Sequence, residues 1–223
     1  MLVLAVDTST PAVTSGLVRH GGEGDPAHIT TVAVRLTDNP RAHAEILTPQ
    51  ILECLDEAGC TPADLDAIVV GVGPGPFTGL RVGMVTAAAF GDALGIPVHG
   101  VCSLDAIAED VRSEAPDGGD LLVVTDARRR EVYFARYDGT RGRVEGPDVR
   151  KPAEVPSAPS HRVAGSSQHT ALFDLPAVPV YSPSPAGLVA AASADLCART
   201  LPEPLIPLYL RRPDAVATAD RRT

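Results

Sequence analysis

The order of apolar segments over the first part of the chain constrains the fold more than any other feature of this sequence. Residues 2–6 form a short, uninterrupted apolar run, which is typical of a buried strand. Other segments have the same character, and two have apolar residues at helical spacing. The sequence therefore predicts three strands in succession, then helix, strand, helix and strand. The expected strands cover 2–6, 12–18, 29–36, 67–72 and 98–101, and the expected helices cover about 41–58 and 79–94.

The two predicted helices have recognisable boundaries. Asn39-Pro40 places a capping residue and a first-turn proline before the first helix, and Gly59 follows that helix. Pro49 falls inside it, where the missing N–H predicts a kink. Gly95 is expected to end the second helix.

The second half of the chain has a weaker pattern. We expect a short helix near Ser103, a turn at 126–130 between two strands, and a helix that packs back on the first half. The Pro-rich stretch at 145–160 has little periodicity and is interpreted as a connecting loop. The expected strands are 121–125, 131–137 and 162–164, and the last helix is 185–199.

The opening meander followed by α/β crossovers resembles the ribonuclease H-like lobe from which actin-like ATPases are built. The predicted fold class is therefore α/β, with an actin-like fold of two lobes, each a mixed sheet flanked by helices. We assign residues 1–102 with about 186–212 to the first lobe, 103–185 to a smaller second lobe, and 213–223 to a flexible tail.

Composition narrows the classes of function. The net charge of −9 argues against a chain that grips nucleic acid unaided, because phosphate binding needs clustered Lys and Arg. If the chain acts on RNA, a partner protein is expected to provide the main contact with the RNA. The simpler interpretation of the negative charge is that it keeps the protein soluble. Aromatic residues make up only 4% of the chain, so the core must consist mainly of Val, Leu, Ile and Ala.

The cysteines indicate buried, reduced thiols. Cys54, Cys60, Cys102 and Cys197 form no C-x-x-C pair and have apolar or helical surroundings. The chain enters a strand pattern at Leu2 without a basic leader, and Gly, Pro and charged residues interrupt its apolar runs. We therefore expect a cytoplasmic protein without a membrane span.

The Gly-rich segment 71–79 follows a strand and opens a helix, where a phosphate-binding loop would lie. It lacks the Gly-Lys-Ser/Thr ending of a Walker loop and the G-x-G-x-x-G spacing. Pro74 and Pro76 also remove two backbone donors. A rigid turn that fixes the helix is the favoured interpretation, and nucleotide binding is the alternative.

A stripe of small residues follows in the second helix. Gly79, Gly83, Ala87 and Gly91 recur every four residues and share one face. Interior glycine costs up to about 1 kcal/mol against alanine, so the stripe indicates close approach by another backbone. That backbone could belong to the same chain or to a partner helix, and the sequence favours neither.

Two aspartates end predicted strands. Asp7-Thr8-Ser9 occupies the place where actin-like ATPases have an Asp-x-Gly-Thr hairpin that holds phosphate and metal, but Ser9 replaces the glycine. These three residues are weak candidates for cofactor binding. The second hairpin, 126–130, carries bulky residues that would crowd a phosphate, which argues against efficient ATP hydrolysis. Arg128 to Arg130 are candidates for contact with an anion or tRNA, with a solvated turn as the alternative.

Catalytic and metal-binding patterns are absent from the sequence. The histidines include no pair at i, i+4 spacing, so no metal site is expected. His43 lies between Arg41 and Glu45 and is expected to be exposed. No G-x-S-x-G elbow or Ser-His-Asp set is visible, so no catalytic residue is predicted.

Several segments together resemble the TsaB (YeaZ) family. The most specific is GPGPFTGLRVG, although Pro76 stands where the family usually has Ser. The long Pro-rich stretch near 145–160 is a second departure. The matching segments are 4–9 (LAVDTS), 41–49 (RAHAEILTP), 73–83 (GPGPFTGLRVG), 126–133 (DARRREVY) and 207–211 (PLYLR).

The resemblance implies a paralogue of TsaD, the transferase that acts on adenosine 37 of ANN-decoding tRNAs. That subunit has a His-x-x-x-His metal motif, and Ser103 and Ile107 stand at its two positions here. Neither side chain can replace an imidazole ligand. The implied function is a non-catalytic subunit that supports threonylcarbamoyl transfer by TsaD, together with the TsaE ATPase.

The resemblance also implies the partners and their interface. TsaD is expected to pair with this chain through the two first-lobe helices. In the absence of TsaD, this chain is expected to form homodimers. Contact with tRNA is expected mainly through the complex. The resemblance implies no cofactor for this chain alone, and a nucleotide at the interface of the complex is left open. The implied interface residues are Arg41, His43, Glu45, Leu47, Ile51, Gly79, Gly83, Ala87 and Gly91.

Two other functions compete with this one. An ATP-using enzyme of the actin-like superfamily, such as a small-molecule kinase, is disfavoured by the degraded phosphate hairpins. A peptidase, an old label in the wider family, is disfavoured because the sequence shows no metal pair and no nucleophile with a base.

Overall fold

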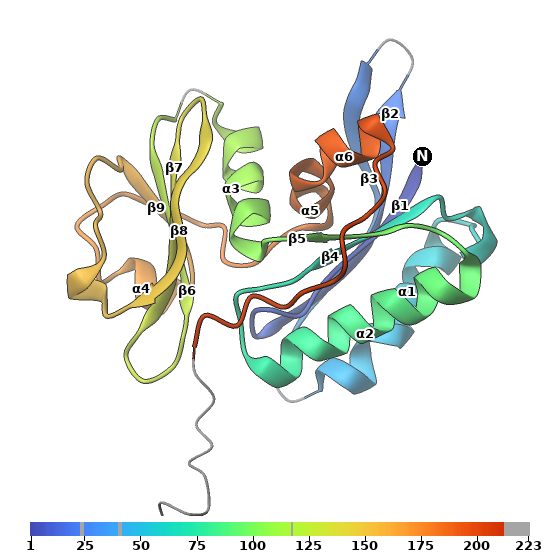
Figure 1. The fold of residues 1–223 in the computed structure, drawn as a ribbon, viewed down its shortest axis with the longest axis horizontal. Coiled ribbons are helices and arrows are strands. Elements are labelled where there is room, and N and C mark those ends of the chain that lie inside the picture. The colour runs from blue at the N-terminus through green and yellow to red at the C-terminus, as the bar shows by residue number, and fades with distance from the viewer. Residues whose placement is uncertain (23–24, 40–41, 117, 212–223) are drawn as a thin grey trace, which may run out of the picture.

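The computed structural model describes residues 1–22, 25–39, 42–116 and 118–211 (Figure 1). The predicted order of elements in the first half is confirmed. The strands are β1 (Leu2–Asp7), β2 (Ala12–Gly22), β3 (Asp25–Asp38), β4 (Ala67–Gly71) and β5 (Val98–Val101). The helices are α1 (His43–Glu57) and α2 (Phe77–Leu94), with a short 3-10 turn at Pro62–Asp64.

The first sheet has the strand order β3-β2-β1-β4-β5. β1 pairs antiparallel with β2 and parallel with β4, so it lies at the centre of the sheet. All six of its residues are buried, because helices cover both faces. This double cover explains why the strand is an uninterrupted apolar run rather than an alternating one.

The second sheet repeats this plan, with the order β10-β9-β6-β7-β8. β6 lies at its centre, antiparallel to β7 and parallel to β9. The two sheets therefore share one topology, although the sequence shows no repeat. The strands are β6 (Leu121–Asp126), β7 (Val132–Asp138), β8 (Gly142–Arg150), β9 (Arg162–Gly165) and β10 (Ala177–Val178), with short helical turns at Pro152–Glu154 and at α4 (Ser167–Thr170).

The structure corrects several boundaries. β8 occupies part of the stretch interpreted as a loop, and Pro147 is tolerated there because β8 is an edge strand. α1 begins at His43 without a side-chain cap, so Asn39 does not cap it, and Pro40 lies outside the described residues. The predicted helix 185–199 is two helices, α5 (Pro185–Ala191) and α6 (Ser193–Ala198). The predicted tail also lies outside the described residues.

Four apolar clusters hold the described elements together, two on the faces of the first sheet and two on the faces of the second. α1 and α2 pack on one face of the first sheet, while α5 and α6 pack on the other face, as predicted for the last helix. α3 (Ser103–Glu114) packs on the second sheet. None of the described helices is both long and apolar enough to cross a membrane. The prediction of buried thiols is confirmed for Cys54 and Cys102, whereas Cys60 is only half-buried and Cys197 is exposed.

An extended segment after α6 runs between the two sheets (Figure 1). The Leu208 N–H donates to the Val72 carbonyl at 2.9 Å, which anchors the segment beyond β4. The Leu208 side chain packs against the cores of both sheets. The segment therefore ties the two halves of the molecule together.

Helices α3 and α5 form a second junction between the halves. Asp110 on α3 accepts hydrogen bonds from the Ser184 N–H at 2.8 Å and from the Ser184 hydroxyl. The Ser184 hydroxyl in turn accepts from the Gly187 N–H at 3.0 Å and caps α5. Burial raises the pKa of Asp110 to about 6, although the bonds from Ser184 oppose the shift.

This shift predicts a pH dependence of stability. The folded protein holds the Asp110 proton more tightly than the unfolded chain does, so this group stabilises the fold at low pH. Its contribution is lost as the pH rises from about 4 to about 6, where the pKa of the folded state lies. We expect Asp110→Asn to remove about 2 kcal/mol of pH dependence from urea unfolding in this window. Asp92→Asn, at an exposed position of α2, should leave the profile unchanged, and an unchanged slope in Asp110→Asn would contradict the assignment.

Candidate functional site

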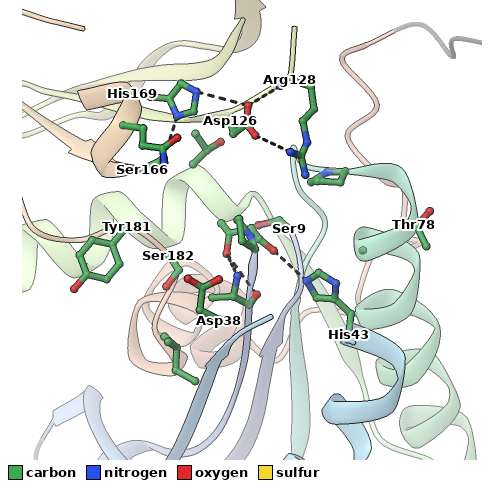
Figure 2. Close-up of a pocket in the computed structure, with 18 of the residues that line it drawn as sticks. Ser9, Asp38, His43, Thr78, Asp126, Arg128, Ser166, His169, Tyr181 and Ser182 are labelled. Carbon is green, nitrogen blue, oxygen red and sulfur yellow. Dashed lines mark hydrogen bonds and ion pairs between the residues drawn. The ribbon is translucent and has the colours of Figure 1, made fainter. Parts of the chain in front are cut away.

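A cavity of about 650 Å³ lies between the two sheets (Figure 2). It is bordered by the ends of β1 and β6, by the first turns of α1 and α2, and by the segments that follow β9 and β10. Most of its polar lining consists of hydroxyl groups, carboxylates and imidazoles. The polar residues labelled in Figure 2 are Ser9, Asp38, His43, Thr78, Asp126, Arg128, Ser166, His169, Tyr181 and Ser182.

Asp7 ends β1 but turns into the protein instead of lining the cavity. Its carboxylate accepts from the Ser9 N–H at 2.8 Å, the Ser9 hydroxyl at 2.7 Å and the Ser103 hydroxyl at 2.6 Å. Burial raises the pKa of Asp7, and these hydrogen bonds oppose the shift. Of the three candidate cofactor-binding residues, Ser9 alone lines the cavity, and Asp7 serves the local structure.

Thr8 joins β1 to α2. Its hydroxyl donates to the Gly79 carbonyl at 2.7 Å and accepts from the Gly83 N–H at 3.1 Å. Both glycines are needed for this approach. A Cβ at Gly79 would lie 2.6 Å from the Thr8 carbonyl oxygen, and a Cβ at Gly83 would lie 2.5 Å from Thr8 Oγ1.

The rest of the small-residue stripe is also covered by the chain itself. Ala87 is 1% exposed, and a Cβ at Gly91 would collide with Val98. Of the two origins left open for this close approach, the structure shows the same chain, because its own sheet fills this face. Leu47 and Ile51 are likewise buried in the core. The partner-binding role assigned to these residues stays a prediction.

Two of the remaining predicted interface residues, His43 and Glu45, lie in the first turn of α1. His43 is half-buried, not exposed as expected, and its Nε2 donates to the Thr10 carbonyl at 3.2 Å. Glu45 is exposed. Arg41 lies outside the described residues.

Asp126 ends β6 as Asp7 ends β1. Each carboxylate accepts from the N–H two residues further on, at 2.7 Å from Arg128 and 2.8 Å from Ser9. Asp126 also lies 3.5 Å from the Arg128 guanidinium and 3.6 Å from His169 Nε2. Unlike Asp7, it lines the cavity (Figure 2). The shared topology thus places one aspartate turn in the interior and one at the cavity.

The turn after Asp126 has an unusual backbone. Arg128, Arg129 and Arg130 all have positive φ, at 63°, 52° and 63°. This conformation costs roughly 1 kcal/mol or more for each residue with a side chain. The turn is held by the Glu131 N–H, which donates to the Arg128 carbonyl at 2.9 Å. All three arginine side chains are exposed, so the cost is not offset by burial.

The Gly-rich loop after β4 packs against the turn that follows β1. A Cβ at Gly75 would collide with the Ser9 backbone. The Gly73 carbonyl accepts from the Ser103 N–H at 2.7 Å, and the Gly73 N–H donates to the Ser103 hydroxyl at 3.3 Å. These contacts give the loop a structural role, in agreement with the favoured interpretation.

Ser103 and Ile107, which the family resemblance aligns with a metal motif, also have structural roles. The Ser103 hydroxyl donates to Asp7, and Ile107 is fully buried in the second core. Within the part of the chain that the structure describes, no group of His, Cys, Asp and Glu side chains is arranged to hold a metal ion.

The second wall of the cavity was missed by the sequence analysis. His169 Nδ1 lies 3.0 Å from the Ser166 hydroxyl, and Tyr181 and Ser182 follow β10. These residues belong to no motif and lie in short turns. The sequence signal that could have indicated this wall was Asp126 at the end of β6, because it marks the edge of the sheet where these residues lie.

Sheet topology and cavity define a two-lobed α/β protein of the actin-like, ribonuclease H-like class. A family model described as TsaD, tRNA N6-adenosine threonylcarbamoyltransferase, matches residues 37–216. The chain therefore belongs to the TsaD family, and within it the chain is similar to proteins named TsaB or YeaZ.

The similar proteins differ in how specifically their names describe a function. Over 215 residues the chain is 57% identical to an uncharacterized protein of Mycobacterium tuberculosis, covering 96% of this chain and 93% of that protein. It is 32% identical over 145 residues to the tRNA threonylcarbamoyladenosine biosynthesis protein TsaB of Bacillus subtilis, covering 65% of this chain and 58% of that protein. The solved structure of YeaZ from Pseudomonas aeruginosa matches with a TM-score of 0.77 at 26% identity, covering 94% of this chain and 99% of that one.

Proposed function

We propose that this chain is a non-catalytic subunit required for threonylcarbamoyl transfer to adenosine 37 of ANN-decoding tRNAs, binding the TsaD transferase together with the TsaE ATPase. The observation that carries the proposal is its likeness to proteins named for threonylcarbamoyladenosine biosynthesis. TsaB of Escherichia coli is 32% identical over 138 residues, covering 61% of this chain and 55% of that protein.

The local structure supports a non-catalytic role. Ser103 and Ile107 cannot bind a metal ion in place of histidine, and both are used in packing or internal hydrogen bonds. The Asp7 carboxylate is fully buried, accepts hydrogen bonds from Ser9 and Ser103, and does not line the cavity, so it is not placed to hold a phosphate-bound metal there. The first hairpin of an ATPase is thus converted into a structural turn.

The outward faces of α1 and α2 are the proposed docking surface for TsaD. Their inward faces are filled by their own sheet, so only the outward faces are accessible. Leu52 on α1 is 51% exposed and Val85 on α2 is 66% exposed, and exposed apolar residues are typical of interfaces. In the absence of the transferase, the same surface would serve for homodimers.

The proposal is tested by reconstitution. Purified TsaD and TsaE are incubated with tRNA, threonine, bicarbonate and ATP, with and without this chain. TsaC from the same organism is added to make the threonylcarbamoyl-AMP donor. Threonylcarbamoyladenosine is then measured by mass spectrometry. We expect product only when the chain is present. An equal amount of product without the chain would refute the proposal. It would favour the ATP-using enzyme, for which the cavity between the sheets would be the binding site.

A further inference from the structure

Five arginines and two aromatic rings form a strip beside the cavity, and all of them are exposed except Arg211, which is half-buried. We call this the basic strip. Its members come from α2, from the turn after β6 and from the segment after α6. They are Phe77, Arg81, Arg128, Arg129, Arg130, Tyr209 and Arg211.

The segment after α6 makes the strip continuous. Arg211 donates to the Ala127 carbonyl at 2.8 Å and lies 3.5 Å from Glu131, so it is attached to the arginine turn. Two residues earlier, the Tyr209 ring stacks on Phe77 with the ring centres 5.0 Å apart.

Arg81 completes the α2 end of the strip. Its guanidinium lies 3.8 Å from the centre of the Phe77 ring, and its Nε donates to the Tyr209 hydroxyl at 2.9 Å. Phe77 is 50% exposed and Tyr209 is 41% exposed, although both are aromatic. Arginines interleaved with exposed aromatic rings are a pattern typical of surfaces that bind single-stranded nucleic acid.

The charge of the strip is opposite to that of the whole chain. Two carboxylates, Asp126 and Glu131, accompany its five arginines, whereas the chain carries a net charge of −9. The arginine turn also keeps three side chains exposed in a conformation that favours glycine. Strained residues persist where the surrounding structure fixes them, and they cluster at functional positions.

We infer that the basic strip binds the phosphate backbone of the RNA substrate, with Phe77 and Tyr209 placed to stack on an unpaired base. This inference rests on the proposed function, because it needs the complex that modifies tRNA. Arginine forms paired hydrogen bonds with phosphate, and a multi-arginine contact releases counterions from RNA. The acidic remainder of the chain explains why the strip would act within a complex and not alone.

Fluorescence anisotropy with a labelled transcript of an ANN-decoding tRNA tests the inference, using the chain in complex with its transferase. We expect Arg128→Ala with Arg130→Ala to weaken binding at least about tenfold and to lower the salt dependence by about two released ions. The matched control, Arg141→Ala with Arg199→Ala, removes two exposed arginines outside the strip and should bind as the parent does.

A second variant separates charge from folding. Arg130→Gly removes the side chain and relieves a positive φ, so it should raise the melting temperature by about 2–4 °C while weakening RNA binding. A merely structural role for Arg130 would not combine these two changes.

The outcomes distinguish the inference from the proposed function. If the parent chain supports tRNA modification and the strip variants bind tRNA as tightly as it does, the inference is wrong and the proposed function stands. If the variants lose affinity for the transferase instead of tRNA, the strip is a protein contact and the inference is also wrong. If the parent chain is dispensable for modification, the proposed function itself fails.

Discussion

Replacing Gly83 by Leu is expected to prevent stable folding. A Cβ at this position would already lie 2.5 Å from Thr8 Oγ1, and a leucine adds three more carbons in the same space. The Thr8 hydroxyl would be displaced from the Gly79 carbonyl and the Gly83 N–H. Overpacking and the loss of buried hydrogen bonds together cost more than about 3 kcal/mol, a large part of the about 5–15 kcal/mol that holds a domain.

Thermal unfolding followed by circular dichroism measures this effect. Val85→Leu, two residues further along α2 but 66% exposed, is the matched control and should melt within a degree or two of the parent. A Gly83→Leu protein that melts with the parent would show that the sheet and α2 can separate without cost. The close packing of α2 against Thr8 would then be contradicted.

Placing two arginines on the outward faces of α1 and α2 is expected to abolish pairing with the transferase. Leu52→Arg with Val85→Arg would bury two unpaired charges at the centre of the proposed interface, which predicts a loss of affinity of at least about 100-fold. The isolated chain should keep its melting temperature, because both positions are at least half exposed. Isothermal titration calorimetry with purified TsaD measures the affinity.

The second lobe offers a matched control for this experiment. Val144 and Leu172 are apolar residues with exposures of 52% and 58%, similar to those of Leu52 and Val85. Val144→Arg with Leu172→Arg should leave the affinity for TsaD unchanged. Equal losses in both double variants would indicate a general effect of added charge. Unchanged affinity in the Leu52 and Val85 variant would exclude these faces as the interface.

The first sheet could be predicted from the sequence because burial on both faces leaves a plain pattern. Residues 2–6 are apolar without interruption, and β1 is the strand that lies at the centre. β8 shows the opposite case. It is an edge strand with half-exposed residues and a proline, so its sequence has no periodicity that distinguishes it from a loop.

The candidate site was only partly predictable. The spacing of Gly79 and Gly83 correctly indicates a close approach, but a spacing does not say which chain makes it, and the answer is Thr8 of the same chain. The cavity wall at His169 and Tyr181 depends on two crossover connections that bring distant turns together. No local sequence pattern shows that these turns lie side by side in the fold.

The extended segment after α6 has a consequence for how the protein matures during synthesis. Leu205 packs in the first core, Leu210 in the second, and Leu208 in both. These residues leave the ribosome after every helix and strand that the structure describes. Both cores therefore stay unfinished until translation has passed them, and a nascent chain arrested before Leu205 would lack the residues that fasten its two halves together.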